Sequence, residues 1–573
     1  MVKKRKVFVL GVDGATFDLI LPWCRQGYLP HISKLLEDSS FGILKSTPEP
    51  NSAQAWSSFM TGLNPGNHGL YYFLRRKENS YDFEFTNSLA RDGKTIWKIA
   101  EENGKKCIVV NVPITFPPEK IDGLLISGMD APGTTAVFTC PSGLYSELKR
   151  EIGEYIIESD ASMLFRAGKY KESLHDLKIT IDNRYKVIRY LMDKYPWELF
   201  TVVLTETDRV QHHFWRFMDR NHLLYKEKES EELKNAILKI YQKTDFVIGK
   251  IQENIDQDTA FIIMSDHGAG PSSNRTVYIN NWLHKIGLLH YKDEGKSNLM
   301  KLHYFRFKSD LMWQLHSVLK RTVPRGIKDF FRRYFPGMAN TIRTFGHSAT
   351  VDWSKTKAYS TETTPNIRIN VNGRYPSGIV EPGQEYEELR DYIIEKLRDL
   401  RDPENNNNVV GEIYKREEIY HGKYLDMAPD IIFRWNNNDY VQRFSKSAPN
   451  NETIQILSPK DLEFAERVSR PSGVHTPDGI VIMQGEDIKK NSQIKKAEII
   501  DLAPTILYLL GIPIPQYMDG RIISEAFNEV YLKNNQPIYL EAGREGDSKK
   551  ETLYSDDEKA KIGERLRGLG YIE

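Results

Sequence analysis

The chain has 573 residues, enough for one large α/β core with insertions or for roughly two to four domains. Its net charge of +1 argues against a protein that forms stable nucleic-acid complexes. The three cysteines, Cys24, Cys107 and Cys140, form no CxxC pair, which argues against a disulfide framework and against a thiolate zinc site.

The N-terminal segment resembles a signal peptide only superficially. Its apolar run, residues 7–12, is shorter than a signal sequence requires and leads directly into Asp13. We therefore predict that this run is the first buried strand. No stretch approaches the length of a transmembrane helix, so the sequence predicts a soluble, cytoplasmic protein, the alternative being an uncleaved or missing leader.

The stretch 47–73 is predicted to be a loop that delivers Ser52 to the N-cap of a short helix. A serine at this position commonly caps the helix with its hydroxyl group. The alternative role is that of a nucleophile, because the free N–H groups of a helix N-terminus can hold a phosphate beside it. That role requires metal ligands elsewhere in the chain to activate the hydroxyl group.

Buried strands predicted at 6–12, 106–112, 199–204 and 259–264 indicate an α/β fold. Asp13 follows the first of them, and Asp208 with His212 follows the third. A spacing of four residues places Asp208 and His212 on one side of a helix, where they can share a metal ion, while His213 points elsewhere. Asp266 and His267 follow the fourth strand. The alternative for this pair is an aspartate that caps the next helix with the histidine bonded to it.

Longer segments separate these motifs. Residues 1–290 are expected to form the first part of the core, with a mostly helical excursion at about 128–197. That excursion carries an apolar stripe typical of a core: Leu174, Leu177, Ile179, Ile181, Val187, Ile188 and Leu191.

Residues 291–350 are expected to form a helical insertion rich in basic and aromatic residues. Three roles are open for it: a lid packed on the core, a cap over an anionic substrate, or a segment (299–348) in peripheral contact with a membrane.

Strands and helices return over residues 351–530, the expected second part of the core. His475 lies there in a loop beside a predicted strand. A helix is expected at 498–510, with Pro504 near its first turn. Residues 531–573 read as a polar C-terminal tail that ends in a charged helix.

The candidate ligands are Asp13, Asp208, His212, Asp266, His267 and His475. The three carboxylates follow buried strands and should converge at one edge of the sheet. A ligand set of carboxylates and imidazoles without thiolates favours Zn²⁺ over Mn²⁺ or Fe²⁺. Six ligands can hold two ions, and two metals with a hydroxyl nucleophile are typical of phosphoryl transfer.

The order Asp…Ser…TGxxPxxHG…Dx3H…SDHG…GxH resembles that of the alkaline phosphatase superfamily. The segments GVDGATFD, AWSSFMTGLNPGNHGLYYF, TDRVQHHFW, MSDHG, DLAPTILYLLGIPIPQYMDGR and ERLRGLGY are most similar to its type I phosphodiesterase and nucleotide pyrophosphatase branch. The resemblance spans nearly the whole chain. It implies a mixed, mostly parallel sheet with helices on both faces and helical insertions.

The resemblance also implies roles for the matched residues. Asp13, Asp266 and His267 would bind the metal that activates Ser52, and Asp208, His212 and His475 would bind the second metal. Ser52 would form a covalent intermediate that water then hydrolyses. One position departs from the branch: Phe73 stands where its nucleotide pyrophosphatases carry an asparagine that holds a phosphate oxygen. None of the cysteines has the context that a formylglycine sulfatase requires.

Three functions are therefore weighed. The first is a two-metal phosphohydrolase, a phosphodiesterase or alternatively a phosphomonoesterase, that acts on a phosphorylated small molecule or nucleotide. The second is a phosphotransferase that uses the same site on a lipid- or glycan-linked phosphate. The third is a non-catalytic binding protein, against which the intact ligand set argues.

Overall fold

A computed structural model describes residues 5–292, 350–444, 452–468, 470–541, 543 and 554–572. The expected insertion at 291–350, and with it the segment 299–348, lies almost entirely outside these residues. Within them, no helix combines the length and the apolar character that crossing a membrane requires.

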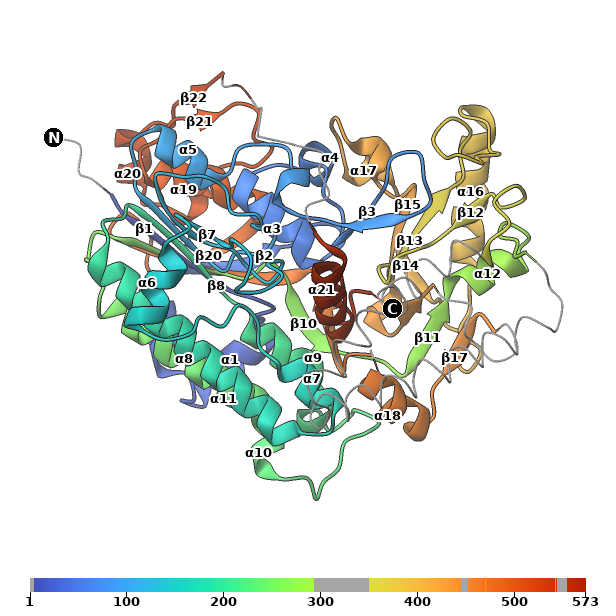
Figure 1. The fold of residues 1–573 in the computed structure, drawn as a ribbon, viewed down its shortest axis with the longest axis horizontal. Helices are drawn as coiled ribbons and strands as arrows, with labels where there is room; N and C mark the ends of the chain where they lie inside the picture. Colours follow the sequence, from blue (N-terminus) through green and yellow to red (C-terminus); the bar gives the residue numbers. More distant parts are fainter. Residues whose placement is uncertain are drawn as a thin grey trace, which may run out of the picture.

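The larger lobe is built on a nine-stranded sheet (Figure 1). Its order is β20 (Ser492–Glu498), β2 (Ser40–Lys45), β19 (Asp478–Gln484), β9 (Ala260–Met264), β1 (Val7–Val12), β8 (Leu199–Leu204), β5 (Cys107–Val110), β6 (Gly123–Ile126) and β7 (Thr139–Cys140). Strand β19 runs antiparallel to both its neighbours, and β7 to β6, whereas the other pairs are parallel. The predicted mixed, mostly parallel sheet is confirmed.

Side chains of β1 alternate between two hydrophobic cores, as the period of a strand buried on both faces requires. Phe8 and Leu10 join the core formed with α8 (Tyr170–Lys194), α9 (Glu206–Met218) and α11 (Ala236–Gln252). Val7 and Val9 join the core on the other face, with α3 (Ser52–Thr61), α5 (Ile96–Glu102) and α19 (Leu502–Leu509). The predicted helices on both faces are therefore present.

Two predicted details differ from the structure. Ile179, which was expected in the apolar stripe of α8, is 42% exposed, whereas the other six members of the stripe are buried. The helix expected at 498–510 begins only at Leu502, because Glu498 is the last residue of β20 and residues 499–501 form a 3₁₀ turn. Pro504 lies in the first turn of α19, where proline costs the helix no hydrogen bond.

A smaller lobe lies beside the sheet (Figure 1). It contains the sheet β12 (Ala358–Tyr359), β13 (Asn366–Ile369), β15 (Ile431–Trp435) and β14 (Val410–Lys415), and the sheet β16 (Val441–Arg443), β11 (Arg275–Tyr278) and β17 (Ile454–Ile456). Helices α12 (Ile279–Lys285) and α16 (Gln384–Arg398) pack with the first of these sheets around a separate hydrophobic core. The expected boundaries near 290 and 351 fall inside this lobe, because residues on both sides of them contribute to its core.

Between the two lobes lies α21 (Asp556–Gly568) (Figure 1). The sequence suggested a polar tail here, but one side of this helix is apolar and buried in the core of the larger lobe. Its buried members, with the residues that follow it, are Ile562, Leu566, Leu569, Tyr571 and Ile572.

Candidate active site

Three neighbouring parallel strands, β8, β1 and β9, deliver the predicted carboxylates to one edge of the sheet. Their register pairs Val12 with Leu204 and Gly11 with Met264. The residues that follow these strands therefore meet, as the sequence predicts. Gly14 has a φ of +69°, and a Cβ atom there would lie 3.2 Å from the Cα of Asp208. The turn after β1 can approach α9 this closely only with glycine.

Asp208 and His212 lie one turn apart on α9, with Asp208 Oδ1 and His212 Nε2 separated by 3.1 Å. His475 comes from β18 (Gly473–Thr476), and its Nε2 lies 3.3 Å from Asp208 Oδ1 and 3.0 Å from His212 Nε2. His213 points away, as predicted, with its Nε2 2.7 Å from Ser162 Oγ. Three ligand atoms thus face one point.

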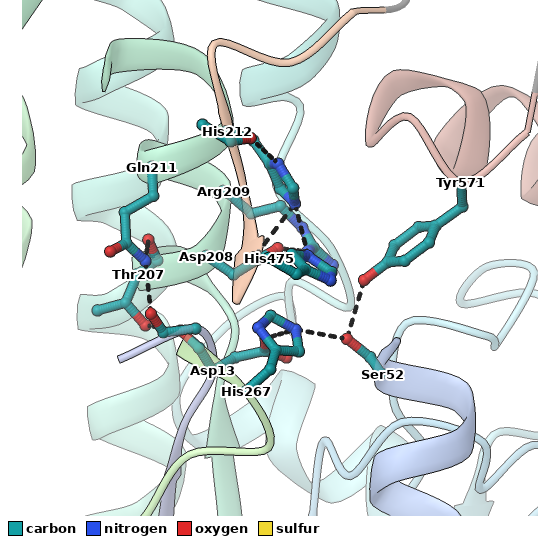
Figure 2. A network of polar contacts seen from close by, with 12 residues as sticks. Asp13, Ser52, Thr207, Asp208, Arg209, Gln211, His212, His267, His475 and Tyr571 are labelled. Carbon is teal, nitrogen blue, oxygen red and sulfur yellow. Dashed lines mark hydrogen bonds and ion pairs between the residues drawn. The ribbon is translucent and has the colours of Figure 1, made fainter. Parts of the chain in front are cut away.

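A second group forms beside the first. His267 Nε2 lies 3.3 Å from Asp266 Oδ2 and 3.6 Å from Asp13 Oδ1. The rings of His267 and His475 stack with their centroids 3.6 Å apart, which joins the two groups into one centre (Figure 2). The structure therefore brings all six candidate ligands together.

The three histidines share one orientation. In each, Nδ1 lies against a backbone carbonyl oxygen: that of Gly473 for His212 at 2.9 Å, Pro50 for His475 at 2.8 Å, and Gly268 for His267 at 3.0 Å. Because a carbonyl oxygen can only accept, Nδ1 carries the proton and Nε2 presents a lone pair to the centre. This is the tautomer that a metal ligand needs.

The residues of the centre fit divalent cations. Among the described residues, none donates a hydrogen bond to the buried carboxylate oxygens of Asp13 or Asp266, although buried polar atoms are normally paired. Nε2 of His212 and Nε2 of His475, both acceptors, face each other at 3.0 Å. Around a tetrahedral Zn²⁺ with bonds of about 2.0–2.1 Å, two ligand atoms lie about 3.3 Å apart, so the spacing suits a shared ion.

Arg209 fixes the orientation of Asp208. Its buried guanidinium donates to Asp208 Oδ2 at 2.6 Å and to Glu158 Oε1 at 2.8 Å. This leaves Asp208 Oδ1 directed toward the histidines. The sequence analysis missed Arg209, although its place directly after Asp208 is the signal that could have indicated it.

Ser52 is the first residue of α3 rather than its N-cap. Asn51 caps the helix, because its side chain accepts from the backbone N–H of Gln54 at 3.0 Å. This corrects the predicted capping role of Ser52 and leaves its hydroxyl group free for the centre. Ser52 Oγ lies 3.3 Å from His267 Nε2 (Figure 2).

Residues 7–320, more than half of the chain, match the sequence model of the type I phosphodiesterase / nucleotide pyrophosphatase family. The chain belongs to this family. It is therefore a hydrolase of the phosphodiesterase and pyrophosphatase class. The metal dependence of the family agrees with two clusters of possible ligand atoms, one of Asp13, Asp266 and His267 and one of Asp208, His267 and His475. No curated protein sequence matches the chain.

Solved structures resemble this family member at low sequence identity. Phosphonoacetate hydrolase from Sinorhizobium meliloti 1021, in complex with phosphonoformate, is 11% identical, with 88% of this chain and 95% of its own covered at a TM-score of 0.50. Human ectonucleotide pyrophosphatase / phosphodiesterase 5 is 14% identical, with 93% and 99% covered at a TM-score of 0.45. The likeness to phosphonoacetate hydrolase concerns the fold, and it agrees with the predicted alkaline-phosphatase-like architecture.

One further side chain of this phosphodiesterase family member reaches Ser52, the candidate nucleophile. The phenol oxygen of Tyr571 lies 2.9 Å from Ser52 Oγ (Figure 2). Burial raises the pKa of Tyr571 well above its usual range, and the negative charges of Asp208 and Asp13 raise it further, so the phenol is neutral. The sequence analysis quoted the terminal GLGY only as part of the resemblance and gave Tyr571 no role.

The pKa values of the carboxyl groups in the centre are shifted in different directions by their surroundings. Burial raises the pKa of Asp13 well above its usual range, and the charges of Asp266 and Asp208 add to that effect. Burial likewise raises the pKa of Asp266 to about 6. For Asp208, burial acts in the same direction. The positive charge and hydrogen bonds of His212 and His475, when these rings are protonated in the metal-free protein, outweigh burial and hold the pKa of Asp208 well below the usual range. Burial lowers the pKa of His267, which keeps this ring neutral.

We expect metal binding by this family member to strengthen as pH rises. Ionised Asp13 and Asp266 cost stability in the metal-free fold, so the contribution of these two groups to its stability is highest below the ordinary carboxyl pKa and falls as pH rises through about 6. A bound cation reverses this dependence because it requires ionised ligands. The increase in Tm caused by Zn²⁺, measured against EDTA, should be larger at about pH 8 than at about pH 5. An increase that is equal at both pH values would contradict this role of the carboxylates.

Proposed function

We propose that the chain is a two-metal phosphoester hydrolase, foremost a phosphodiesterase, in which Ser52 is the nucleophile. One observation carries the proposal: Ser52 Oγ, which is not used as a helix cap, lies 3.3 Å from His267 Nε2 in the centre where both ligand groups meet. A hydroxyl nucleophile beside two cation sites is the arrangement that phosphoryl transfer needs.

Asp13, Asp266 and His267 would hold one cation, and Asp208, His212 and His475 the other. Nitrogen and oxygen donors without a thiolate favour Zn²⁺, with Mn²⁺ as the alternative. Cations bound there would supply Lewis-acid chemistry, which lowers the pKa of a hydroxyl nucleophile and offsets the negative charge of a phosphoryl group.

The chain's own residues then account for the remaining chemistry. Ser52 Oγ loses its proton and forms a bond to phosphorus while the bond from phosphorus to the ester oxygen breaks, and the departing oxygen takes up a proton. Water next attacks phosphorus in the ester formed on Ser52, which still carries the second ester group of a diester substrate. The bond between phosphorus and Oγ breaks, and Ser52 regains a proton. The N-terminus of α3 directs free N–H groups and partial positive charge toward the phosphate in both steps.

The proposed substrates are phosphorylated small molecules, with nucleotide esters as one class. Two alternatives use the same site: hydrolysis of monoesters, and transfer from a lipid- or glycan-linked phosphate to an alcohol. Contact between residues 299–348 and an anionic substrate or a membrane remains a sequence-based proposal, because this segment lies outside the described residues.

Hydrolysis assays with p-nitrophenyl phosphate, bis(p-nitrophenyl) phosphate and p-nitrophenyl nucleotide esters test the proposal. The metal content of each preparation is measured in parallel. We expect the diesters to be hydrolysed fastest, EDTA to abolish turnover, and Zn²⁺ or Mn²⁺ to restore it. Absence of turnover on every ester by protein with two bound metals would contradict the proposal.

A further inference from the structure

The segment that follows α21 lies against the proposed nucleophile. Tyr571 follows α21, and its phenol oxygen lies 2.9 Å from Ser52 Oγ. His267 approaches Ser52 from a different direction than the phenol of Tyr571 does (Figure 2). Ser52 is 1% and Tyr571 5% exposed, so the phenol forms a buried wall of the site beside Ser52.

The backbone places Tyr571 there through the way α21 ends. Gly570 has a φ of +79° and donates from its N–H to the carbonyl of Arg567 at 3.2 Å, while the N–H of Tyr571 donates to the carbonyl of Leu566 at 3.0 Å. This pair of bonds is a Schellman motif, in which the left-handed residue turns the chain sharply away from the helix axis. The carbonyl of Tyr571 in turn accepts from the hydroxyl of Tyr72 at 2.5 Å.

The ring of Tyr571 also packs against two other rings. Its centroid lies 4.4 Å from that of Phe73 and 5.6 Å from that of His475. The guanidinium of Arg565 on α21 donates to the carbonyls of Met129 and Ala131. Withdrawal of this segment from the site would expose its buried apolar side chains, which are Ile562, Leu566, Leu569 and Ile572. The segment is therefore a fixed wall of the site and not a removable plug.

We propose that Tyr571 is a catalytic residue whose phenol donates a hydrogen bond to a non-bridging oxygen of the phosphoryl group that Ser52 attacks. This inference rests on the proposed function. Phosphorus must bond to Ser52 Oγ, so the phosphoryl oxygens must enter the surroundings of an atom only 2.9 Å from the phenol oxygen.

The position of the hydroxyl protons before and after the bond to phosphorus forms supports the same assignment. Before the reaction, Ser52 and Tyr571 share one hydrogen bond in which either hydroxyl can donate. Once Oγ is bonded to phosphorus it carries no proton, so the phenol must be the donor. A phosphoryl oxygen, which gains negative charge in the transition state, is the stronger acceptor within reach. The phenol thus adds a hydrogen-bond donor to the charge stabilisation that bound cations would supply.

The full-length, metal-loaded Tyr571→Phe variant tests the proposal, because it keeps the ring and its packing and removes only the hydroxyl group. Two quantities are measured: kcat/KM for bis(p-nitrophenyl) phosphate, and the Kd of inorganic phosphate by calorimetry. We expect both to worsen by about 10- to 100-fold, with metal content and Tm unchanged.

Tyr554→Phe is the matched control. Tyr554 lies just before α21, its ring stacks on Phe116 at 5.6 Å, and its hydroxyl donates to the carbonyl of Asp130 at 3.3 Å, away from Ser52. Its loss should change both quantities by less than about twofold, because the variant loses one neutral hydrogen bond that does not reach Ser52.

Each outcome decides between specific alternatives. An unchanged phosphate Kd in Tyr571→Phe overturns the proposal, and so do tighter phosphate binding and faster turnover, which would make the phenol a plug. If the wild type hydrolyses no ester yet binds phosphate more tightly than Tyr571→Phe does, the proposed function fails while the phosphate contact of Tyr571 stands.

Discussion

Ser52→Ala is expected to lower kcat for diesters by at least about a thousand-fold while the protein keeps both metals. The hydroxyl group is the proposed nucleophile, and the six candidate ligands all lie on other residues. Asn51 caps α3, so the variant keeps its helix cap and should unfold at nearly the same temperature as the wild type. Steady-state kinetics, metal analysis and thermal unfolding of one preparation measure these three quantities together.

Ser57→Ala is the control for this variant. Ser57 is buried on the same helix, and its hydroxyl donates to the carbonyl of Ala53 at 2.7 Å. It should keep wild-type kinetics, since the hydroxyl group does not reach the centre. Substantial turnover by Ser52→Ala would mean that water attacks phosphorus directly, and the covalent intermediate would then be wrong.

The parts of the site that the sequence predicts are those with a local signal. Asp13, Asp208 and Asp266 each follow a continuous apolar run, and such runs form buried parallel strands whose carboxyl ends share an edge. The spacing of Asp208 and His212 places them on one helix face without any knowledge of the rest of the fold. His475 carries no comparable local pattern, and only the resemblance connected it to the others.

The parts that the sequence could not predict depend on contacts between distant segments. Tyr571 meets Ser52 across 519 positions, and no periodicity near the C-terminus indicates where that helix packs. The same holds for Arg209, whose partner Glu158 belongs to the helical excursion. The sequence could not decide whether Asn51 or Ser52 caps α3, because asparagine and serine both favour the N-cap position. Only the observed hydrogen bond of Asn51 decides between them.

The second large effect is expected from Asp266→Asn, which should remove one metal ion and lower kcat by about a thousand-fold, or about 4 kcal/mol. Asparagine has nearly the same shape but lacks the charge that balances a cation. Asp266 is fully buried without a hydrogen-bond donor among the described residues, and its pKa is raised to about 6. At neutral pH the variant no longer buries that charge, so the metal-free protein should be at least as stable as the wild type.

The control is a buried aspartate whose carboxylate accepts hydrogen bonds from the protein backbone. Asp245 accepts from the backbone N–H groups of Ile32 at 2.7 Å and His31 at 3.3 Å, so its carboxylate has structural partners. Asp245→Asn should keep both metals and wild-type kinetics but lose stability, by about 1–3 kcal/mol, because an amide can present its N–H₂ group to one of those donors. Asp266→Asn would then lose activity without losing stability, whereas Asp245→Asn would lose stability without losing activity. Asp266→Asn protein that keeps two metals and turns over normally would show that this carboxylate holds no ion.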